Sequence, residues 1–342
     1  DEHSVFEIAS ITKTFTGILL ANMILNNEVK RDDDLHGYLP PGIKAPIRNG
    51  RTIKLIELAN HTSSLPHGPD NLNPSNPENY YADYTEDQLY AFINSYEPQR
   101  DFGSEYEYSN YAVALLSHVL AAKKGKTYEE LVMDEIAIPL GMKNTRIELT
   151  SEMKNNLTMG YRQGFEKGYF DYGALAGSGG FYSTASDMIR YVAANMGKTE
   201  SSLYPAMSLS HKTTMQVNNK LSIGLTWAIV AWDDLEIVCH SGNTPGFNSF
   251  IGFVNGGDKG VVVLSNSGEM IKDIGFHILN PTVQLRNDTK HVAFIMRNVF
   301  DTKGIEAAFK TYWQLKKDHE EDYSFAEYEL NNLGYHFLEE GK

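Results

Sequence analysis

Residues 10–28 read SITKTFTGILLANMILNNE, a serine followed by apolar residues at helical spacing. This pattern predicts a long helix with Ser10 at its amino end. Ser10 and Lys13 stand three positions apart, so a helix places the hydroxyl and the amine on one face, within reach of each other. An amine whose pKa is lowered by burial or by nearby positive charge can take the hydroxyl proton. The stretch therefore predicts a helix that carries a candidate nucleophile and a candidate base.

Ser-x-x-Lys alone is a weak signal, because short patterns also occur by chance. Residues 151–154, SEMK, match it too, but they lie in a polar stretch with no apolar helix after them. We interpret that second copy as a helix cap. The copy at residues 10–13 is followed by the long apolar helix, so it is the candidate site.

The middle of the chain, to about residue 200, alternates helical patterns with polar loops. Apolar residues at helical spacing predict helices near residues 55–60, 86–95, 109–123 and 127–137. The stretch 65–80, LPHGPDNLNPSNPENY, is dense in proline, asparagine and glycine and predicts a loop. This loop is a candidate wall of a binding site.

After residue 220 the pattern changes to short apolar runs separated by turn-forming residues. The runs are LTWAIVAW, LEIVCHS, FNSFIGFV and GVVVLSNS, and the turns contain Asp233-Asp234 and Asn255-Gly256-Gly257. Such runs and turns predict an antiparallel meander. An early helix, a helical middle and a late sheet predict an α+β fold, with an antiparallel sheet flanked by helices, a mainly helical subdomain and a cleft between two lobes.

The chain beyond residue 282 has a different pattern. Two amphipathic stretches, FIMRNVFDTKGIEAAFKTYWQLKKDH and FAEYELNNLGYHFLEEGK, predict a carboxyl-terminal helical tail. We therefore divide the chain into a main domain at residues 1–282 and a helical extension at residues 290–342. The extension resembles the start of a tetratricopeptide array, in which stacked repeats bury each other's faces. Packing of these helices on the main domain is one interpretation, and recruitment of a protein partner is the other.

Charge and composition disfavour several classes of function. The formal charge of −14 disfavours nucleic-acid binding, which relies on clustered lysine and arginine. No apolar run reaches the length of about 18 residues that a membrane-spanning helix needs. The single cysteine, Cys239, excludes an internal disulfide and a zinc site of several thiolates. Cys239 lies in an apolar run and is interpreted as a packing residue.

A Tyr-x-Asn motif is a second candidate for chemistry. Tyr108 and Asn110 stand just before the apolar helix YAVALLSHVL. A phenol beside a charged lysine can be partly ionised and act as a general base, and a carboxamide can hold a substrate carbonyl. Taken alone, the tripeptide is more often ordinary loop polarity or a helix cap.

A His-x-Gly motif ends the apolar run LEIVCHS. The small residues Ser241 and Gly242 let a substrate backbone lie along the strand edge, and the amide of Asn243 can point at a developing oxyanion. A lone histidine such as His240 is more often structural than catalytic. The motif gains weight only together with the other two.

The order and placement of the three motifs resemble the class C β-lactamase and DD-peptidase family. That family has Ser-x-x-Lys at the first long helix, Tyr-x-Asn about a hundred residues later and Lys/His-x-Gly on a late strand. Further pieces are similar to the family: HTSSLP at residues 61–66, PLGMKNT at 139–145, GGFYSTASDM at 179–188 and NTPGFNSF at 243–250. The resemblance spans roughly residues 5–270 and implies the β-lactamase/transpeptidase-like fold.

The resemblance also implies a role for each residue. Ser10 attacks the substrate carbonyl and forms an acyl-enzyme, while Lys13 and Tyr108 share the proton transfers, and which of the two is the base stays open. Asn110 holds the substrate amide, and the main-chain amides of Ser10 and Asn243 form the oxyanion hole. Neither a metal nor a cofactor is needed.

Departures from the family pattern bear on the substrate. Class C β-lactamases usually carry Lys-Thr-Gly where this chain has His240-Ser241-Gly242, and a histidine with a pKa near ~6.5 grips a β-lactam carboxylate weakly at neutral pH. His-x-Gly is similar to the DD-peptidases, D-aminopeptidases and several esterases. Ser64 stands in HTSSLP where the family has glycine.

The predicted function is therefore that of a D-Ala-D-Ala carboxypeptidase or related D-peptidase-like penicillin-binding protein. The alternatives are a carboxylesterase or class C-like β-lactamase, and, outside the enzymes, an inactive penicillin-fold scaffold protein. The substrate is a D-amino-acid peptide, a β-lactam or an ester. The family places a strand pair before the nucleophile helix, so we expect those strands and an export signal upstream of Asp1, and a periplasmic or secreted location.

Overall fold

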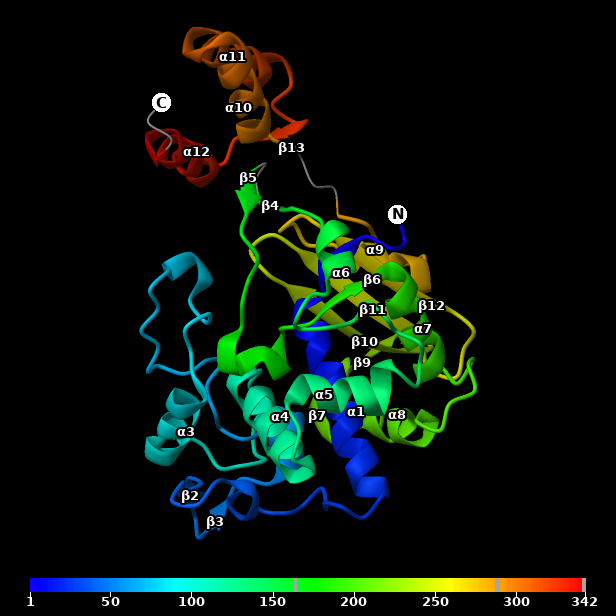
Figure 1. Cartoon of the computed structure of the whole chain (residues 1–342). Coiled ribbons are helices and arrows are strands. Elements are labelled where there is room, and N and C mark those ends of the chain that lie inside the picture. Colours follow the sequence, from blue (N-terminus) through cyan, green and yellow to red (C-terminus); the bar gives the residue numbers. More distant parts are fainter. Residues whose placement is uncertain (163–164, 287–289, 340–342) are drawn as a thin grey trace.

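The computed structural model describes residues 1–162, 165–286 and 290–339. Within them a six-stranded antiparallel sheet, in the order β12-β11-β10-β9-β8-β7, forms the middle layer of the main body (Figure 1). Its strands are β7 (Met215–Asn218), β8 (Leu221–Ile223), β9 (Ala228–Trp232), β10 (Leu235–Asn243), β11 (Asn248–Val254) and β12 (Gly260–Ser265). The predicted α+β fold and its late meander are confirmed.

The turns of the meander are those that the sequence indicated. Asp233, between β9 and β10, has φ 52°, and Gly256, between β11 and β12, has φ 70°. Both are left-handed conformations, which aspartate and glycine adopt more readily than most residues. These two hairpin turns therefore follow from their local sequence.

The nucleophile helix crosses behind the sheet. It begins as a 3-10 turn at Ala9–Ile11, continues as α1 (Thr12–Leu25) and is buried along most of its length. A helix that is apolar all round belongs in a protein interior, which explains this central place. The helix ends three residues earlier than the pattern over residues 10–28 indicated, because Asn27 takes a left-handed φ of 58°.

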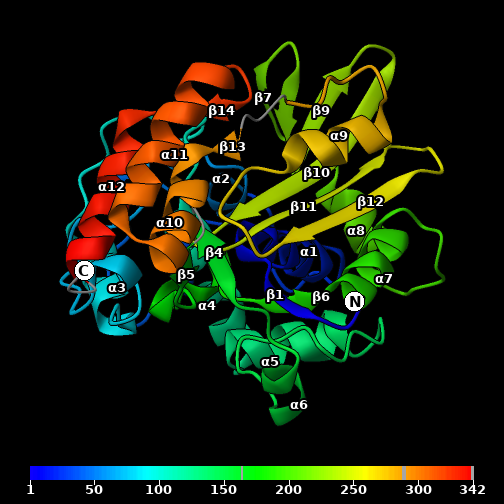
Figure 2. The ribbon, with the colours of Figure 1, turned by 90° about the horizontal axis from the view of Figure 1, so that it is seen from above.

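Helices cover both faces of the sheet, as Figure 2 shows with α9 (Lys272–Leu279) on the side opposite α1. On the α1 side the strands contribute buried Ile229, Val238 and Ile251 to the main core. On the other side they contribute Ile237 and Cys239 to a smaller cluster with α9, among other residues. Alternating residues of one strand thus pack into different layers.

The predicted middle helices are present as α2 (Leu55–Ala59), α3 (Glu86–Ser95), α4 (Asn110–Lys124) and α5 (Tyr128–Val132, continued as a π-helix over Met133–Ala137). The same part of the chain also contains α6 (Ser151–Asn155), α7 (Ala185–Asn195) and α8 (Tyr204–Ser210). Short 3-10 turns lie at Leu35–Tyr38, Pro77–Asn79 and Gly173–Ser178. Thr150, not Ser151, caps α6, so the second Ser-x-x-Lys serves a helix start, with the cap one residue earlier than expected.

Three small strand pairs tie the loops together. They are β1 (Val5–Glu7) with β6 (Tyr182–Thr184), β2 (Ile47–Arg48) with β3 (Arg51–Thr52), and β4 (Gly160–Arg162) with β5 (Phe165–Lys167). The β1–β6 pair holds the segment before the nucleophile against the segment that follows Gly180.

The carboxyl-terminal residues form α10 (Val292–Lys303), α11 (Ile305–Asp318) and α12 (Glu327–Glu339), with the short parallel pair β13 (Lys290–His291) and β14 (Tyr323–Ser324). The first predicted amphipathic stretch is two helices, because Gly304 has φ 82° and breaks it. The β4–β5 hairpin lies next to these helices (Figure 1). Across the described residues, no helix combines the length and apolar character needed to span a membrane.

Candidate active site

Ser10, the candidate nucleophile, follows a tight turn and lines a cavity. Ala9 has φ 47°, a left-handed conformation that costs energy for a residue with a side chain. This turn presents Ser10 to a cavity of about 720 Å³. Backbone held in such a conformation next to a reactive group is typical of sites where position matters more than stability.

Lys13 is fully buried beneath Ser10. Its Nζ lies 3.0 Å from Ser10 Oγ and donates a hydrogen bond to the Ser178 carbonyl at 2.6 Å. Burial holds the pKa of Lys13 well below its usual range, and no described carboxylate forms an ion pair with it. A neutral amine has a lone pair, so Lys13 can accept the proton of Ser10.

Tyr108 is also buried, and it stands over Lys13. Lys13 Nζ lies 4.8 Å from the centre of the Tyr108 ring, and Tyr108 and Ser10 line the same cavity. The ring of His61 packs on Tyr108 at 4.6 Å. Burial raises the pKa of Tyr108, so this phenol is protonated at neutral pH. The partial phenolate considered from the sequence is disfavoured in the free protein, because burial of Tyr108 raises its pKa.

Asn110 is the first residue of α4 rather than part of a loop. Ser109 caps the helix by accepting a hydrogen bond from the Ala112 amide at 2.9 Å, and its own amide donates to His61 Nδ1 at 3.1 Å. Asn110 Oδ1 is buried and accepts no hydrogen bond from the described protein atoms. An unsatisfied amide oxygen at a cavity wall is ready to accept an N–H from a ligand.

Gly242 lets β10 approach the nucleophile turn. A Cβ at Gly242 would lie 2.2 Å from the Ile8 carbonyl oxygen and 2.4 Å from Ser249 Oγ. Only glycine fits this approach, which brings the backbones of Asn243 and Ser10 to the same cavity. The two amides proposed for the oxyanion hole therefore share one wall.

The edge of β10 is open where a substrate would lie. Pairing of β10 with β9 ends at Cys239 opposite Ala228, whereas pairing with β11 continues to Asn243 opposite Asn248. The β9-side edge of residues 240–243 is thus left uncovered by β9. An extended peptide can add to such an edge through main-chain hydrogen bonds.

His240 differs from the other predicted residues. Its Nδ1 lies 2.8 Å from the Ser241 carbonyl, and burial lowers the pKa of His240 to about 3. The imidazole is therefore neutral. His240 lines a cavity that adjoins the Ser10 cavity. Lys13 is buried, and the remaining predicted residues line the Ser10 cavity itself: Ser10, Tyr108, Asn110, Ser241, Gly242 and Asn243.

Several lining residues were not predicted individually. They are His67, Tyr80, Tyr81, Arg162, Phe170, Tyr172, Thr244, Pro245, Asn248, Gly268, Met270 and Lys272. The first three belong to or adjoin the loop 65–80, which was predicted as a wall, and Thr244, Pro245 and Asn248 fall within the NTPGFNSF stretch. No local signal marks the two cations, Arg162 and Lys272.

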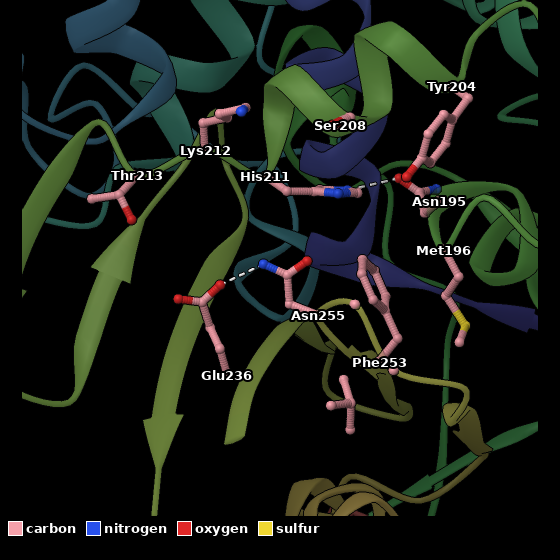
Figure 3. Close-up of a pocket in the computed structure, with 13 residues that line it drawn as sticks. Asn195, Met196, Tyr204, Ser208, His211, Lys212, Thr213, Glu236, Phe253 and Asn255 are labelled. Atoms are coloured by element: carbon pink, nitrogen blue, oxygen red, sulfur yellow. Dashed lines mark hydrogen bonds between the residues drawn. The ribbon is translucent and has the colours of Figure 1, made fainter. Parts of the chain in front are cut away.

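Another cavity, of about 430 Å³, lies away from these residues at the opposite end of β10 (Figure 3). Its walls include His211, whose Nε2 lies 2.9 Å from Asn195 Oδ1, and Glu236, which accepts a hydrogen bond from Asn255. Burial lowers the pKa of His211 to about 3, so it is neutral. No predicted site residue lines this cavity. Among the described residues there is also no group of three or more metal-ligating side chains.

Comparison with known proteins identifies the family. A β-lactamase family model matches residues 1–276. The chain belongs to the β-lactamase family. Its members are serine hydrolases, so the chain is an enzyme of that class, with a β-lactamase/transpeptidase-like fold.

Two relatives illustrate the similarity. The chain is 30% identical over 268 residues to the D-alanyl-D-alanine-carboxypeptidase/endopeptidase AmpH of Escherichia coli (73% of this chain, 68% of that protein). It is 26% identical over 302 residues to a β-lactamase of the same organism (78% of this chain, 76% of that protein).

Solved structures agree on the fold. A β-lactamase/D-alanine carboxypeptidase from Yersinia pestis is 29% identical with a TM-score of 0.69, over 78% of this chain and 79% of that chain. A β-lactamase/D-alanine carboxypeptidase from Pseudomonas syringae, at 19% identity and a TM-score of 0.72 over 83% and 86% of the two chains, shows the shared fold alone. In this β-lactamase-family chain Ser64 has φ 59°, which explains why glycine suits that position.

Proposed function

We propose that this β-lactamase-family chain is a D-Ala-D-Ala carboxypeptidase or a closely related D-peptidase that works through an acyl-enzyme on Ser10. The observation that carries the proposal is the distance of 3.0 Å between Ser10 Oγ and the Nζ of Lys13, whose pKa burial lowers, in a cavity that the open edge of β10 also lines. The similarity to AmpH and to the Yersinia pestis enzyme supports the choice of substrate.

Acylation follows from the placement of the groups. Lys13 Nζ accepts the proton of Ser10 as Oγ attacks the carbonyl carbon, and the resulting oxyanion is held by the amides of Ser10 and Asn243. The C–N bond then breaks. Tyr108, which keeps its proton because burial raises its pKa, donates that proton to the leaving nitrogen. The proton on Lys13 returns through Tyr108, so the free amine of the product leaves neutral.

Deacylation uses the same groups in reverse. A water molecule gives a proton to Lys13 and its oxygen attacks the ester carbonyl; Ser10 Oγ then leaves with the proton that Lys13 returns to it. Asn110 Oδ1 accepts no hydrogen bond among the described residues. It can therefore accept one from the amide N–H of the acyl group and so position that group.

The neutral state of His240 favours a peptide over a β-lactam as the physiological substrate. Class C β-lactamases usually carry a lysine at the His240 position, whereas an imidazole with a pKa of about 3 carries no charge there to pair with a β-lactam carboxylate. A D-amino-acid peptide gains more of its binding from main-chain hydrogen bonds along β10. Peptides of this kind lie outside the cytoplasmic membrane, so the proposal includes a periplasmic or secreted location.

The test is release of free D-alanine from an N-acylated D-Ala-D-Ala peptide, measured beside hydrolysis of a p-nitrophenyl ester. We expect D-alanine release by the parent protein and none by Ser10→Ala. Ser151→Ala, in the second Ser-x-x-Lys, is the matched control and should behave as the parent. Hydrolysis of the ester without release of D-alanine would contradict the peptidase proposal and indicate a carboxylesterase.

A further inference from the structure

A second cavity adjoins the Ser10 cavity. It has a volume of about 390 Å³, and Tyr108, Ser241 and Lys272 line both. Lys13 Nζ lies 3.0 Å from Ser10 Oγ and 4.8 Å from the centre of the Tyr108 ring, so the shared Tyr108 wall places the meeting of the two cavities beside Ser10. A substrate held at Ser10 can therefore extend one part into each.

The walls of the second cavity are mainly apolar. The side chains come from β8, β9, β11 and α9, and they are Leu221, Ile223, Ala228, Val230, Phe250 and Phe276. On β9 the residues alternate, so that Ala228 and Val230 face this cavity while Ile229 joins the main core on the other face of the sheet. Apolar surface that is only partly covered gains free energy when a ligand removes it from water.

The charges of the cavity are equally distinctive. His61 and His240 both line it, and burial lowers the pKa of each below the usual range, so both are neutral. Lys272, at the amino end of α9, is the one residue with a permanent charge among the described residues that line it. No ion pair of Lys272 with a described carboxylate is formed. The cavity thus offers an apolar body with a single cation at its rim.

The two cavities take different parts of the substrate. Asn110 and Asn243, which hold the acyl amide and the oxyanion, line the first cavity and not the second. Tyr108, which donates a proton to the leaving nitrogen, lines both. The leaving group therefore departs toward the second cavity.

We propose that the second cavity selects leaving groups that are D-amino acids with a large apolar side chain, whose carboxylate pairs with Lys272. This inference rests on the proposed peptidase function and names its preferred substrate. The methyl group of D-alanine leaves most of the cavity unfilled, since 390 Å³ has room for on the order of ten water molecules. A leucine or phenylalanine side chain occupies more of this volume than the methyl group does and covers more of the apolar walls.

The first measurement compares two peptides with the same acyl-D-Ala portion and either D-Ala or D-Leu as the leaving residue. Each extra methylene in an apolar pocket is worth roughly tenfold or more in discrimination, so we expect kcat/KM for the D-Leu peptide to exceed that for D-Ala by at least about tenfold. Equal values, or preference for D-Ala, would overturn the proposal.

A substitution that fills the second cavity tests whether this cavity receives the leaving group. In Ala228→Phe the new ring occupies the cavity, so the ratio of D-Leu to D-Ala turnover should fall to about one or below. Ala231→Phe is the matched control, because Ala231 lies on the same strand, is exposed and does not line the cavity. A ratio that falls equally in both variants, or in neither, would contradict the assignment.

The proposed pairing of Lys272 with the carboxylate of the leaving residue is tested by removing either charge. The parent should prefer a free carboxyl terminus over the carboxamide of the same peptide, and Lys272→Met should lose most of that preference while Lys272→Arg keeps it. Unchanged preference in Lys272→Met would remove Lys272 from the proposal.

Failure of the peptidase function and failure of this inference give different results. The matching esters, with D-lactate or its leucine-like analogue as leaving group, report the same ratio if peptides are not cleaved. If neither series turns over, calorimetry measures how tightly Ser10→Ala binds each intact peptide. Tighter binding of the D-Leu peptide, lost when Ala228→Phe is added, would support the cavity assignment without the peptidase function. Equal affinities there would overturn it.

Discussion

At the scale of single residues, the account depends on the charge state of two neighbours, Lys13 and Tyr108. Burial disfavours the charged form of each, which favours an amine and a phenol over an ammonium and a phenolate. The proposed mechanism therefore has Lys13 accept the Ser10 proton and Tyr108 donate to the leaving group.

This division of labour predicts a leaving-group dependence in Tyr108→Phe. A peptide nitrogen must be protonated to leave, so we expect kcat for peptide hydrolysis to fall by about 10²–10⁴-fold. p-Nitrophenolate leaves without a proton, so the rate of acylation by a p-nitrophenyl ester should fall far less. This rate is measured from the initial burst of p-nitrophenolate. Equal losses with both substrates would instead make Tyr108 the general base.

Glu7 predicts a pH dependence of stability. Its side chain is 4% exposed, and burial raises its pKa from 4.5 to about 7, although its Oε1 accepts a hydrogen bond from the Phe170 amide. A raised carboxyl pKa means that the folded state holds the proton more tightly than the unfolded chain. Stability from this group is therefore complete below about pH 4.5 and is lost as pH rises toward 7, by about 3 kcal/mol.

Glu7→Gln keeps the acceptor oxygen and removes the titration. We expect the free energy of unfolding of the parent to fall relative to that of Glu7→Gln between pH 5 and pH 8, as measured by urea denaturation at each pH. A constant difference between the two proteins across this range would show that Glu7 does not titrate there.

At the scale of elements, the oxyanion wall depends on how closely β10 approaches the nucleophile turn. In Gly242→Ala the new Cβ has no room beside the Ile8 carbonyl, so β10 must move away and the amides of Ser10 and Asn243 separate. Loss of one oxyanion donor costs about 10²–10³-fold in kcat, and we expect a loss of that order. Gly37→Ala, where a Cβ meets no atom within 4 Å, is the control.

Thermal unfolding of both glycine variants separates the site from the fold. We expect Gly242→Ala to unfold cooperatively, as the control does, and to lose activity at temperatures where it is folded. Full activity in folded Gly242→Ala would contradict the proposed oxyanion wall.

The elements themselves were largely predictable from local sequence. The apolar pattern after Ser10, the helix at Asn110–Lys124 and the late strands each carry their own periodicity and caps, and all are present. What sequence did not predict are features set by contacts distant in the chain. The protonated Tyr108 is one, since its pKa depends on burial among residues from three separate segments.

At the scale of the whole molecule, one hairpin links the carboxyl-terminal helices to the cavity. β4 carries Arg162, which lines the Ser10 cavity, and β5 carries Phe165, which is 5% exposed and packs with Val292 and Met296 of α10. The guanidinium of Arg297 lies 4.1 Å from the Phe165 ring centre. Helices beyond the catalytic body thus touch the strand pair that forms part of the substrate cavity.

Phe165→Ala should loosen this contact. Removing a buried phenylalanine costs about 3–5 kcal/mol of local packing, so we expect faster proteolytic release of the helices and a raised KM with a smaller change in kcat. Phe309→Ala is the matched control, because Phe309 on α11 is 59% exposed. Identical proteolysis of parent and Phe165→Ala would show that the hairpin does not hold the helices.

The reactive residues of the candidate site were predictable from the sequence, whereas the other residues that line its cavity were not. Ser10, Lys13, Tyr108 and the β10 motif stand in recognisable patterns, because reactive groups must keep fixed spacings. Arg162 and Lys272 carry no such pattern, since the cavity between the helical part and the sheet brings them in from separate segments. The second cavity is likewise formed only once β9 and α9 are placed together.

The most direct test of the central claim is intact-protein mass spectrometry after rapid mixing with excess penicillin and an acid quench. Ser10 as nucleophile predicts a covalent adduct with the mass of one penicillin on the parent and on Ser151→Ala, and none on Ser10→Ala. The absence of an adduct on the folded parent at every mixing time, or an adduct that persists in Ser10→Ala, would contradict the assignment of Ser10.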